Sequence, residues 1–167
     1  MKKILSLTLA LAMIGTALTG CGSKNTAAQT PAENTQQTAP VQQEQSQTEK
    51  ALALINTFAT GDTDTAHSLL ADGYIQHNLA YGTGADAFIG SVEYLASADV
   101  KTTVNNIRAF EDGDKVFLQT VYNFAGAGEQ VAFDIFRFDE NGKIADHWDV
   151  METIADQSTW QNQNGKF

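Results

Sequence analysis

The 167-residue sequence is poor in cysteine, proline and basic side chains, with one, two and ten of them respectively. A single cysteine excludes a disulfide within the chain and any zinc site built from several cysteines. Twenty acidic residues outnumber the basic ones and give a formal charge of −10, so the chain lacks the surplus of Lys and Arg that nucleic acids require. We therefore expect no nucleic-acid partner. Hydrophobic residues make up 43% of the chain, enough for the core of one compact domain.

Charge is also missing from residues 4–18, which follow the cationic start Met1-Lys2-Lys3. This run is shorter than the roughly 20 residues that a membrane-spanning helix needs. A cationic start followed by a short apolar run is typical of a secretory signal peptide, here residues 1–20. The next residues, Leu18-Thr19-Gly20-Cys21, resemble the lipobox of bacterial lipoproteins, in which the cysteine is lipid-modified after the peptide is cut just before it. The alternative is an ordinary signal peptide with a chance cysteine.

The lipobox resemblance implies a lipid-anchored protein on the extracytoplasmic side of the bacterial cell membrane, attached through Cys21. Residues 21–48 then comprise the lipidated cysteine and a tether rich in Gln, Thr and Ala, which contains both prolines and no aromatic residue. Such a composition cannot offset the entropy of ordering, so we expect a flexible segment. The predicted domain follows at residues 49–155, with a C-terminal tail at 156–167.

The hydrophobic pattern changes its period within this domain. Apolar residues recur with helical spacing in its first half, and β-branched and aromatic residues separated by glycine turns fill its second half. This order predicts an α+β fold, a cone-shaped antiparallel curved sheet with about three N-terminal helices packed on its concave face. Where side chains do not fill the cone, a ligand pocket remains. The helices are expected within residues 51–59, 63–73 and 85–95, and the strands at 100–110, 116–124, 131–138 and 143–150.

The predicted hairpin around Asn141-Gly142 limits which side chains share a face of the sheet. A four-residue loop places Asp134 opposite His147, and a two-residue loop places it opposite Asp149. Because strand side chains alternate, either even-length loop brings these three residues to one face. An odd loop or a bulge would replace His147 and Asp149 on that face with Asp146 and Trp148.

Asp134 stands out because it interrupts an apolar strand, Val131-Ala132-Phe133-Asp134-Ile135-Phe136. A carboxylate is costly to bury unless it is paired, and a neighbouring histidine would supply the partner. An imidazole oriented by a carboxylate is also a usable general base near neutral pH. The alternative is that Asp134 and His147 are cross-strand neighbours on the solvent face.

A second polar cluster is Tyr74-Ile75-Gln76-His77-Asn78, in which four of the five side chains can form hydrogen bonds. Its alternative interpretation is a surface turn with a single histidine. His67 reads as a solvated surface residue. The sequence contains no serine-nucleophile motif, phosphate loop or metal-type histidine pair, so we expect neither a metal nor a cofactor.

Taken in order, Tyr74-Ile75-Gln76-His77-Asn78, Asp134-Ile135-Phe136-Arg137-Phe138, Asn141-Gly142-Lys143-Ile144 and His147-Trp148-Asp149-Val150 resemble the SnoaL-like proteins. These belong to the nuclear-transport-factor-like superfamily of α+β cones. The resemblance covers roughly residues 50–154. It implies a pocket for a small apolar or carbonyl-containing molecule, and it makes a homodimer formed through the sheet a candidate assembly. The sequence departs from the family pattern at Leu79, where the family usually has a proline.

The family's pocket residues can be carried over by position. His77, Asp134 and His147 would be catalytic, while the substrate-binding residues would be Tyr74, Gln76, Asn78, Trp148 and Asp149. Arg137 would balance the acidic site or hold Asp149. Two functions follow from this resemblance: aldol, cyclase or isomerase-type acid–base chemistry without a cofactor, or non-catalytic binding of a ligand or protein at the cell envelope. In a third interpretation, aromatic residues such as Phe88, Phe117, Phe133 and Trp148 fill the cone and leave no cavity.

Overall fold

The computed structural model of the protein describes residues 44–167. The predicted signal peptide, Cys21 and the tether up to residue 43 lie outside the described residues. Within residues 44–167, no helix has the length and apolar character needed to cross a membrane.

Three helices lie in the first half of the described chain, and local side-chain caps mark where the first two begin. Ser46 and Glu49 form a reciprocal capping box at the start of α1, and Gly61 ends it in a left-handed conformation, with φ of 75°. Asp62 then accepts the backbone N–H of Thr65 and caps α2. The first helix therefore begins within the last residues of the predicted tether. The bounds are Gln47–Thr60 for α1, Thr63–Leu69 for α2 and Ala85–Ser97 for α3.

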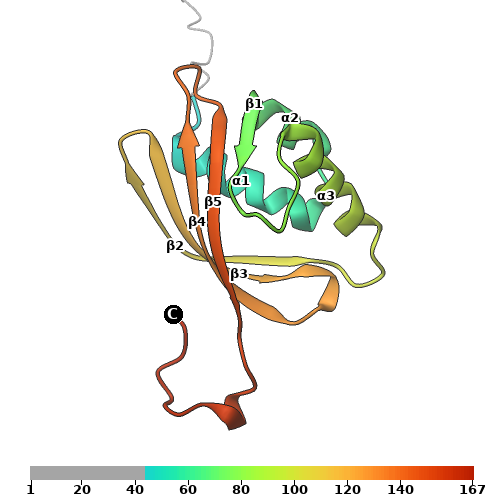
Figure 1. Ribbon diagram of the computed structural model, residues 1–167, viewed down its shortest axis with the longest axis vertical. Coiled ribbons are helices and arrows are strands. Elements are labelled where there is room, and N and C mark those ends of the chain that lie inside the picture. The colour runs from blue at the N-terminus through green and yellow to red at the C-terminus, as the bar shows by residue number, and fades with distance from the viewer. Residues whose placement is uncertain (1–43) are drawn as a thin grey trace, which may run out of the picture. The chain divides into compact units, whose positions relative to one another are not determined.

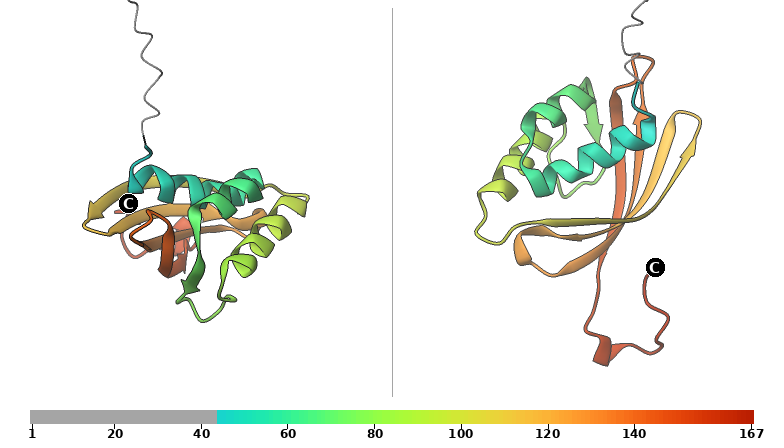
Figure 2. Two further views of the ribbon diagram at one scale, coloured as in Figure 1. Left: turned by 90° about the horizontal axis from the view of Figure 1, so that it is seen from above. Right: turned by 180° about the vertical axis from the view of Figure 1, so that it is seen from behind.

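The five strands form one curved sheet, and the helices cover one of its faces (Figures 1 and 2). The spatial order is β1-β5-β4-β3-β2, in which every neighbouring pair is antiparallel except β1 and β5. The expected α+β fold is confirmed, with helices first and a meander of four antiparallel strands after them. The bounds are Leu70–Gln76 for β1, Thr103–Asp112 for β2, Lys115–Asn123 for β3, Glu129–Phe138 for β4 and Ile144–Thr153 for β5.

The parallel strand β1 is the one departure from the expected antiparallel sheet. The sequence predicts that the second helix ends at Gly73, but α2 ends at Leu69 and the chain enters β1 directly. Gly73 lies within this strand at the edge of the sheet. Because α3 and three further strands separate β1 from its neighbour β5, the two can run in the same direction.

Two irregularities in the β4–β5 hairpin cancel each other. Asp139 donates its backbone N–H to the carbonyl of Lys143, at 2.8 Å, which leaves a three-residue loop. A bulge follows, since Phe138 pairs with Ile144 while the preceding Arg137 pairs with Asp146. An odd loop or a bulge alone would exchange the two faces of β5, but together they restore the original alternation.

Asp134 consequently lies opposite Asp149, as a two-residue turn would have placed it. His147 shares their face of the sheet, the inner face that the helices cover. Asp146 and Trp148 point to the outer face.

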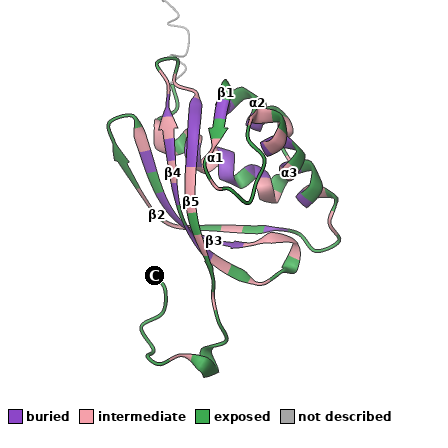
Figure 3. Ribbon diagram, in the orientation of Figure 1, coloured by how far each residue is buried: buried purple, intermediate pink, exposed green. Residues whose placement is uncertain are grey.

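The core lies between the helices and the inner face of the sheet (Figure 3). The outer face is only partly covered. On this face, Gln119 donates a hydrogen bond to the carbonyl of Lys166 at 2.9 Å, so the end of the C-terminal tail contacts the sheet. The tail also contains the short helix η2, Gln157–Thr159. The large side chains buried most completely are Tyr122, Phe136, Leu54, Ile55, Leu118, Ile144, Val92 and Val116.

Candidate functional site

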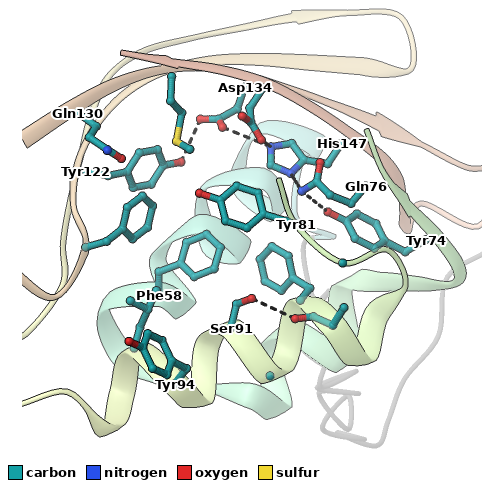
Figure 4. A pocket seen from close by; sticks show the side chains of 18 of the residues that line it. Phe58, Tyr74, Gln76, Tyr81, Ser91, Tyr94, Tyr122, Gln130, Asp134 and His147 are labelled. Carbon is teal, nitrogen blue, oxygen red and sulfur yellow. Dashed lines mark hydrogen bonds and ion pairs between the residues drawn. The ribbon is translucent and has the colours of Figure 1, made fainter. Parts of the chain in front are cut away.

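A cavity of about 490 Å³ lies between the helices and the inner face of the sheet (Figure 4). This volume is within the range of small-molecule sites. The interpretation in which aromatic residues fill the cone is therefore wrong: Phe88 lines the cavity, but Phe117 and Phe133 are exposed on the outer face. The walls are mainly aromatic and the polar groups gather on β1, β4 and β5. The lining includes Phe58, Tyr74, Gln76, Tyr81, Phe88, Tyr94, Tyr122, Phe124, Asp134, His147, Asp149 and Met151.

Asp134 is buried at the polar end of this cavity, with 3% of its surface exposed. The hydroxyl of Tyr122 donates a hydrogen bond to its Oδ2 at 2.9 Å, and Nε2 of His147 lies 3.3 Å from its Oδ1. Both oxygens therefore have protein partners, as a buried carboxylate requires. Burial raises the pKa of the Tyr122 hydroxyl well above its ordinary range, and the nearby charge of Asp134 adds to this, so Tyr122 remains a donor.

The side chain of Gln76 determines which nitrogen of His147 carries the proton. The backbone N–H of Asn78 donates to Oε1 of Gln76 at 2.9 Å, which turns the Gln76 amide nitrogen toward Nδ1 of His147, also at 2.9 Å. The amide nitrogen can only donate, so Nδ1 must accept and the ring proton is on Nε2. Nε2 of His147 then directs its N–H toward Asp134. Neither of its nitrogens is free to take a proton from a ligand.

Asp149 is the more available carboxylate. Its side chain is 4% exposed, and its Oδ1 accepts a hydrogen bond from the side chain of Asn78. Its Oδ2 lies 3.9 Å from Nε2 of His147, and no donor of residues 44–167 comes within hydrogen-bonding distance of that oxygen. Burial raises the pKa of Asp149, and the charge of Asp134 acts in the same direction, while Asn78 and His147 oppose the shift.

The loop between β1 and α3 adds Tyr81 to the cavity, where Figure 4 shows its ring among the lining side chains. Its surface is 50% exposed, and its hydroxyl makes no hydrogen bond within the described part of the chain. Burial, reinforced by the charge of Asp149, raises the pKa of Tyr81, so its hydroxyl is a donor at neutral pH.

Two of the predicted pocket residues lie elsewhere. His77 and Trp148 are absent from the cavity lining, and their rings stack on the outer face of the sheet with centroids 4.3 Å apart. The reason is strand alternation: His77 follows Gln76, and Trp148 stands between the inward-facing His147 and Asp149. Nε2 of His77 bonds to Asp146 at 2.8 Å, and the guanidinium of Arg137 donates to the other oxygen of the same carboxylate.

The other predicted residues gather at the site. Tyr74, Gln76, Asp134, His147 and Asp149 line the cavity, whereas Asn78 reaches it only through its hydrogen bond to Asp149. Arg137 holds Asp146 on the outer face and does not contact Asp149. His67 is exposed on α2.

Two residues of the site, Tyr81 and Tyr122, are not among those predicted from the sequence. Alternation along β3 could have placed Tyr122 on the same face as Leu118 and Thr120. Tyr81 lies in an irregular loop, for which the sequence carries no comparable signal.

Asp134, His147 and Asp149 also offer three potential metal-ligand atoms, all within 4.8 Å of one another. A metal at this point would need the lone pair of Nε2 of His147, but the Gln76 contact leaves the proton on that nitrogen. Binding a metal through His147 would thus require the Gln76 amide to turn over and place its nitrogen against the N–H of Asn78. The cluster fits a metal poorly in this hydrogen-bonding arrangement.

A curved sheet covered by helices on its inner face, with a polar cluster at one end of an apolar cavity, defines an α+β cone with a small-molecule pocket. The family of SnoaL-like domains matches residues 51–147, more than half of the chain, and the chain belongs to this family. No curated protein matches the sequence.

Several solved structures share the fold. An NTF2-like protein of unknown function from Cytophaga hutchinsonii has a TM-score of 0.57 at 16% identity, covering 66% of this chain and 94% of its own. An LEH-like epoxide hydrolase from M. tuberculosis has a TM-score of 0.55 at 18% identity, with 64% and 82% covered. IdmH, a putative polyketide cyclase from Streptomyces antibioticus, has a TM-score of 0.52 at 18% identity, with 65% and 93% covered. Identities this low establish the fold and leave the reaction open.

Proposed function

We propose that this protein is a cofactor-free acid–base catalyst that acts on a small apolar carbonyl compound. The observation that carries the proposal is Asp149, a nearly buried carboxylate at the cavity with a raised pKa and one oxygen free of hydrogen bonds. A base whose pKa is raised toward the working pH is more effective than an ordinary surface carboxylate.

In the proposed reaction, Oδ2 of Asp149 takes a proton from the carbon beside the carbonyl group. The electron pair of the broken C–H bond forms a C=C bond, the π pair of the carbonyl group moves to its oxygen, and the product is an enolate. The unpaired hydroxyl of Tyr81 donates a hydrogen bond to that oxygen. If a double bond is conjugated with the enolate, return of the proton from Asp149 to a more distant carbon gives an isomerase. Attack of the enolate carbon on a second carbonyl of the same molecule forms the ring C–C bond, and the resulting alkoxide takes the proton from Asp149, which gives a cyclase.

His147 has a positioning role in this mechanism instead of the base role expected from the sequence. Its Nε2–H lies between the two carboxylates, and Gln76 holds its other nitrogen. Asn78 similarly fixes the second oxygen of Asp149. This support leaves Oδ2 as the oxygen that faces a bound molecule.

The direct test is exchange of carbon-bound hydrogen. The full chain is incubated in D2O with a panel of cyclic ketones and β-diketones, and deuterium at the carbon beside the carbonyl is followed by NMR. We expect exchange above the buffer rate with at least one compound, lost in Asp149→Asn and kept in Asp146→Asn, the matched change on the outer face. Equal exchange by wild type and Asp149→Asn would contradict the mechanism.

Non-catalytic ligand binding is the second candidate, and the hydrogen-bonding of His147 favours it. With both ring nitrogens engaged, the site lacks a free imidazole for proton transfer. A compound that raises the melting temperature and is recovered unchanged, without deuterium, would support this function over catalysis.

We also propose that the protein is anchored to the bacterial cell membrane on its extracytoplasmic side through a lipid on Cys21. The support is the sequence Leu18-Thr19-Gly20-Cys21 after a cationic, apolar start. Mass spectrometry of the protein expressed in a bacterium should find an acylated Cys21 as the N-terminus, and Cys21→Ser should remain unmodified and uncut. An N-terminus elsewhere in the wild type would contradict the anchor.

A homodimer formed through the outer face of the sheet is the proposed assembly. Phe117 and Phe133 are 38% and 54% exposed there, and Val150, opposite Phe133 on β5, is 72% exposed. Exposed apolar groups on adjacent strands are typical of an interface. Sedimentation should give a dimer that Phe133→Asp converts to a monomer; a wild-type monomer at micromolar concentration would contradict the assembly.

A further inference from the structure

The cavity has two carboxylates at one end, and they lie close together. Asp134 and Asp149 lie opposite each other on β4 and β5, and Nε2 of His147 lies 3.3 Å from an oxygen of Asp134 and 3.9 Å from one of Asp149. None of the described residues that line the cavity is Lys or Arg.

One oxygen of this pair has no hydrogen-bonding partner. The side chain of Asp149 is 4% exposed, so bulk water does not fully solvate it, and its Oδ2 receives no hydrogen bond from the described residues. A buried charge of this kind is stabilised by a proton or by a cation brought in from outside. A bound anion would instead be repelled at short range in a poorly solvated site.

The remaining walls suit a cation that carries apolar groups. The ring of Tyr122 stacks on Phe124 with centroids 4.9 Å apart, and Phe58 lies 4.9 Å from Phe88, which in turn lies 6.0 Å from Tyr74. These five rings form a continuous wall of the cavity. Aromatic faces attract ammonium groups, and the attraction is strongest where water is excluded.

We propose that the cavity binds apolar organic cations, with an ammonium group beside the carboxylates of Asp134 and Asp149 and the hydrocarbon part against the aromatic wall. The inference rests on the proposed small-molecule function of the cavity and holds whether or not proton transfer follows binding. It predicts that ligands of one shape are ranked by charge, cation first, neutral second and anion last.

Three probes with nearly the same skeleton separate charge from shape. They are benzyltrimethylammonium, 2,2-dimethyl-3-phenylpropan-1-ol and 2,2-dimethyl-3-phenylpropanoate, which are cationic, neutral and anionic at pH 7. Isothermal titration of the full chain should show the cation binding at least about tenfold more tightly than the alcohol, the size expected of a partly desolvated cation–π and ion-pair contact. The carboxylate should bind weakest. Equal or tighter binding of the alcohol would overturn the inference.

Two variants assign the preference to the inner carboxylates. Asp149→Asn should reduce the cation-to-alcohol ratio severalfold. Asp146→Asn, on the outer face, should leave the ratio unchanged. If Asp149→Asn keeps the full ratio, the proposed position of the ammonium group is wrong.

The result also distinguishes this inference from the proposed catalysis. Charge ranking without hydrogen exchange in any ketone would retain the cation site and contradict the proton-transfer proposal. Exchange without charge ranking would do the reverse.

Discussion

The two faces of the sheet each carry an Asp–His pair, built from the same strands but in opposite electrostatic surroundings. On the inner face, His147 lies beside two carboxylates, those of Asp134 and Asp149, and the described residues that line the cavity include no lysine or arginine. On the outer face, the single carboxylate of Asp146 receives both His77 and Arg137.

The pKa values of the two faces shift in opposite directions for this reason. Burial raises the pKa of Asp149, and the neighbouring Asp134 contributes to the increase. Burial also acts to raise the pKa of Asp146, but hydrogen bonds from His77 and Arg137 outweigh it and hold that pKa below its ordinary value. A counter-charge therefore makes the outer pair a structural contact, and its absence leaves the inner pair able to exchange a proton or accept a cation.

The two faces should differ most in how far the free energy of unfolding falls when the histidine of each face is replaced. His147→Ala removes the hydrogen bond to the buried carboxylate of Asp134 and should lower the free energy of unfolding by about 3 kcal/mol at pH 7. His77→Ala removes one partly exposed hydrogen bond and a stacked ring, and should cost about 1 kcal/mol. Urea denaturation measures both. Equal losses would mean that the inner carboxylates do not depend on His147.

A smaller loss of stability is expected when Arg137, the positive charge on the outer face, is replaced. Arg137→Met leaves Asp146 with the hydrogen bond from His77 and should cost about 1 kcal/mol at pH 7, since the guanidinium is partly exposed. Hydrogen exchange and ligand affinity in the cavity should not change. A loss of either in a folded variant would show that the two faces are coupled through β4 and β5.

The smallest effect is on how stability varies with pH. A carboxyl group with a raised pKa holds its proton more tightly in the folded state, so the contribution of Asp149 to stability falls as pH rises from its ordinary value of 3.8 through its folded pKa. Asp146 has the opposite sign: its contribution is complete above 3.8 and is lost as pH falls through its lowered pKa.

Urea denaturation from pH 3 to pH 7 should show both effects. Asp149→Asn should remove the decline toward pH 7, and Asp146→Asn should weaken the loss of stability at low pH. An unchanged slope in Asp149→Asn would indicate that its carboxyl group titrates alike in the folded and unfolded chains.

The sequence predicted the class of fold because its periodicity changes clearly from helical to alternating. An even-length loop was expected to bring Asp134, His147 and Asp149 to one face, and an odd loop or a bulge to separate them. The hairpin has both an odd loop and a bulge, which offset each other and bring the three residues together. No local pattern predicts such a compensation, because each irregularity depends on backbone hydrogen bonds across the hairpin.

The positions of His77 and Trp148 could not be carried over from the family pattern. A sequence motif on a strand consists of consecutive residues, but the side chains of consecutive residues in a strand point to opposite faces of the sheet. The same alternation that brings His147 and Asp149 into the cavity excludes Trp148 between them. Tyr81 entered the site only with the geometry of an irregular loop, for which the sequence has no periodic pattern.

The most direct test is a ¹³C NMR titration of the aspartate carboxyl groups in the full chain, with the Asp149 signal assigned by its loss in Asp149→Asn. We expect the midpoint of Asp149 above the ordinary value of 3.8 and that of Asp146 below it. A midpoint of Asp149 at or below 3.8 would contradict the account, because the inner carboxylate would then be a stabilised anion that needs neither a proton nor a cationic ligand.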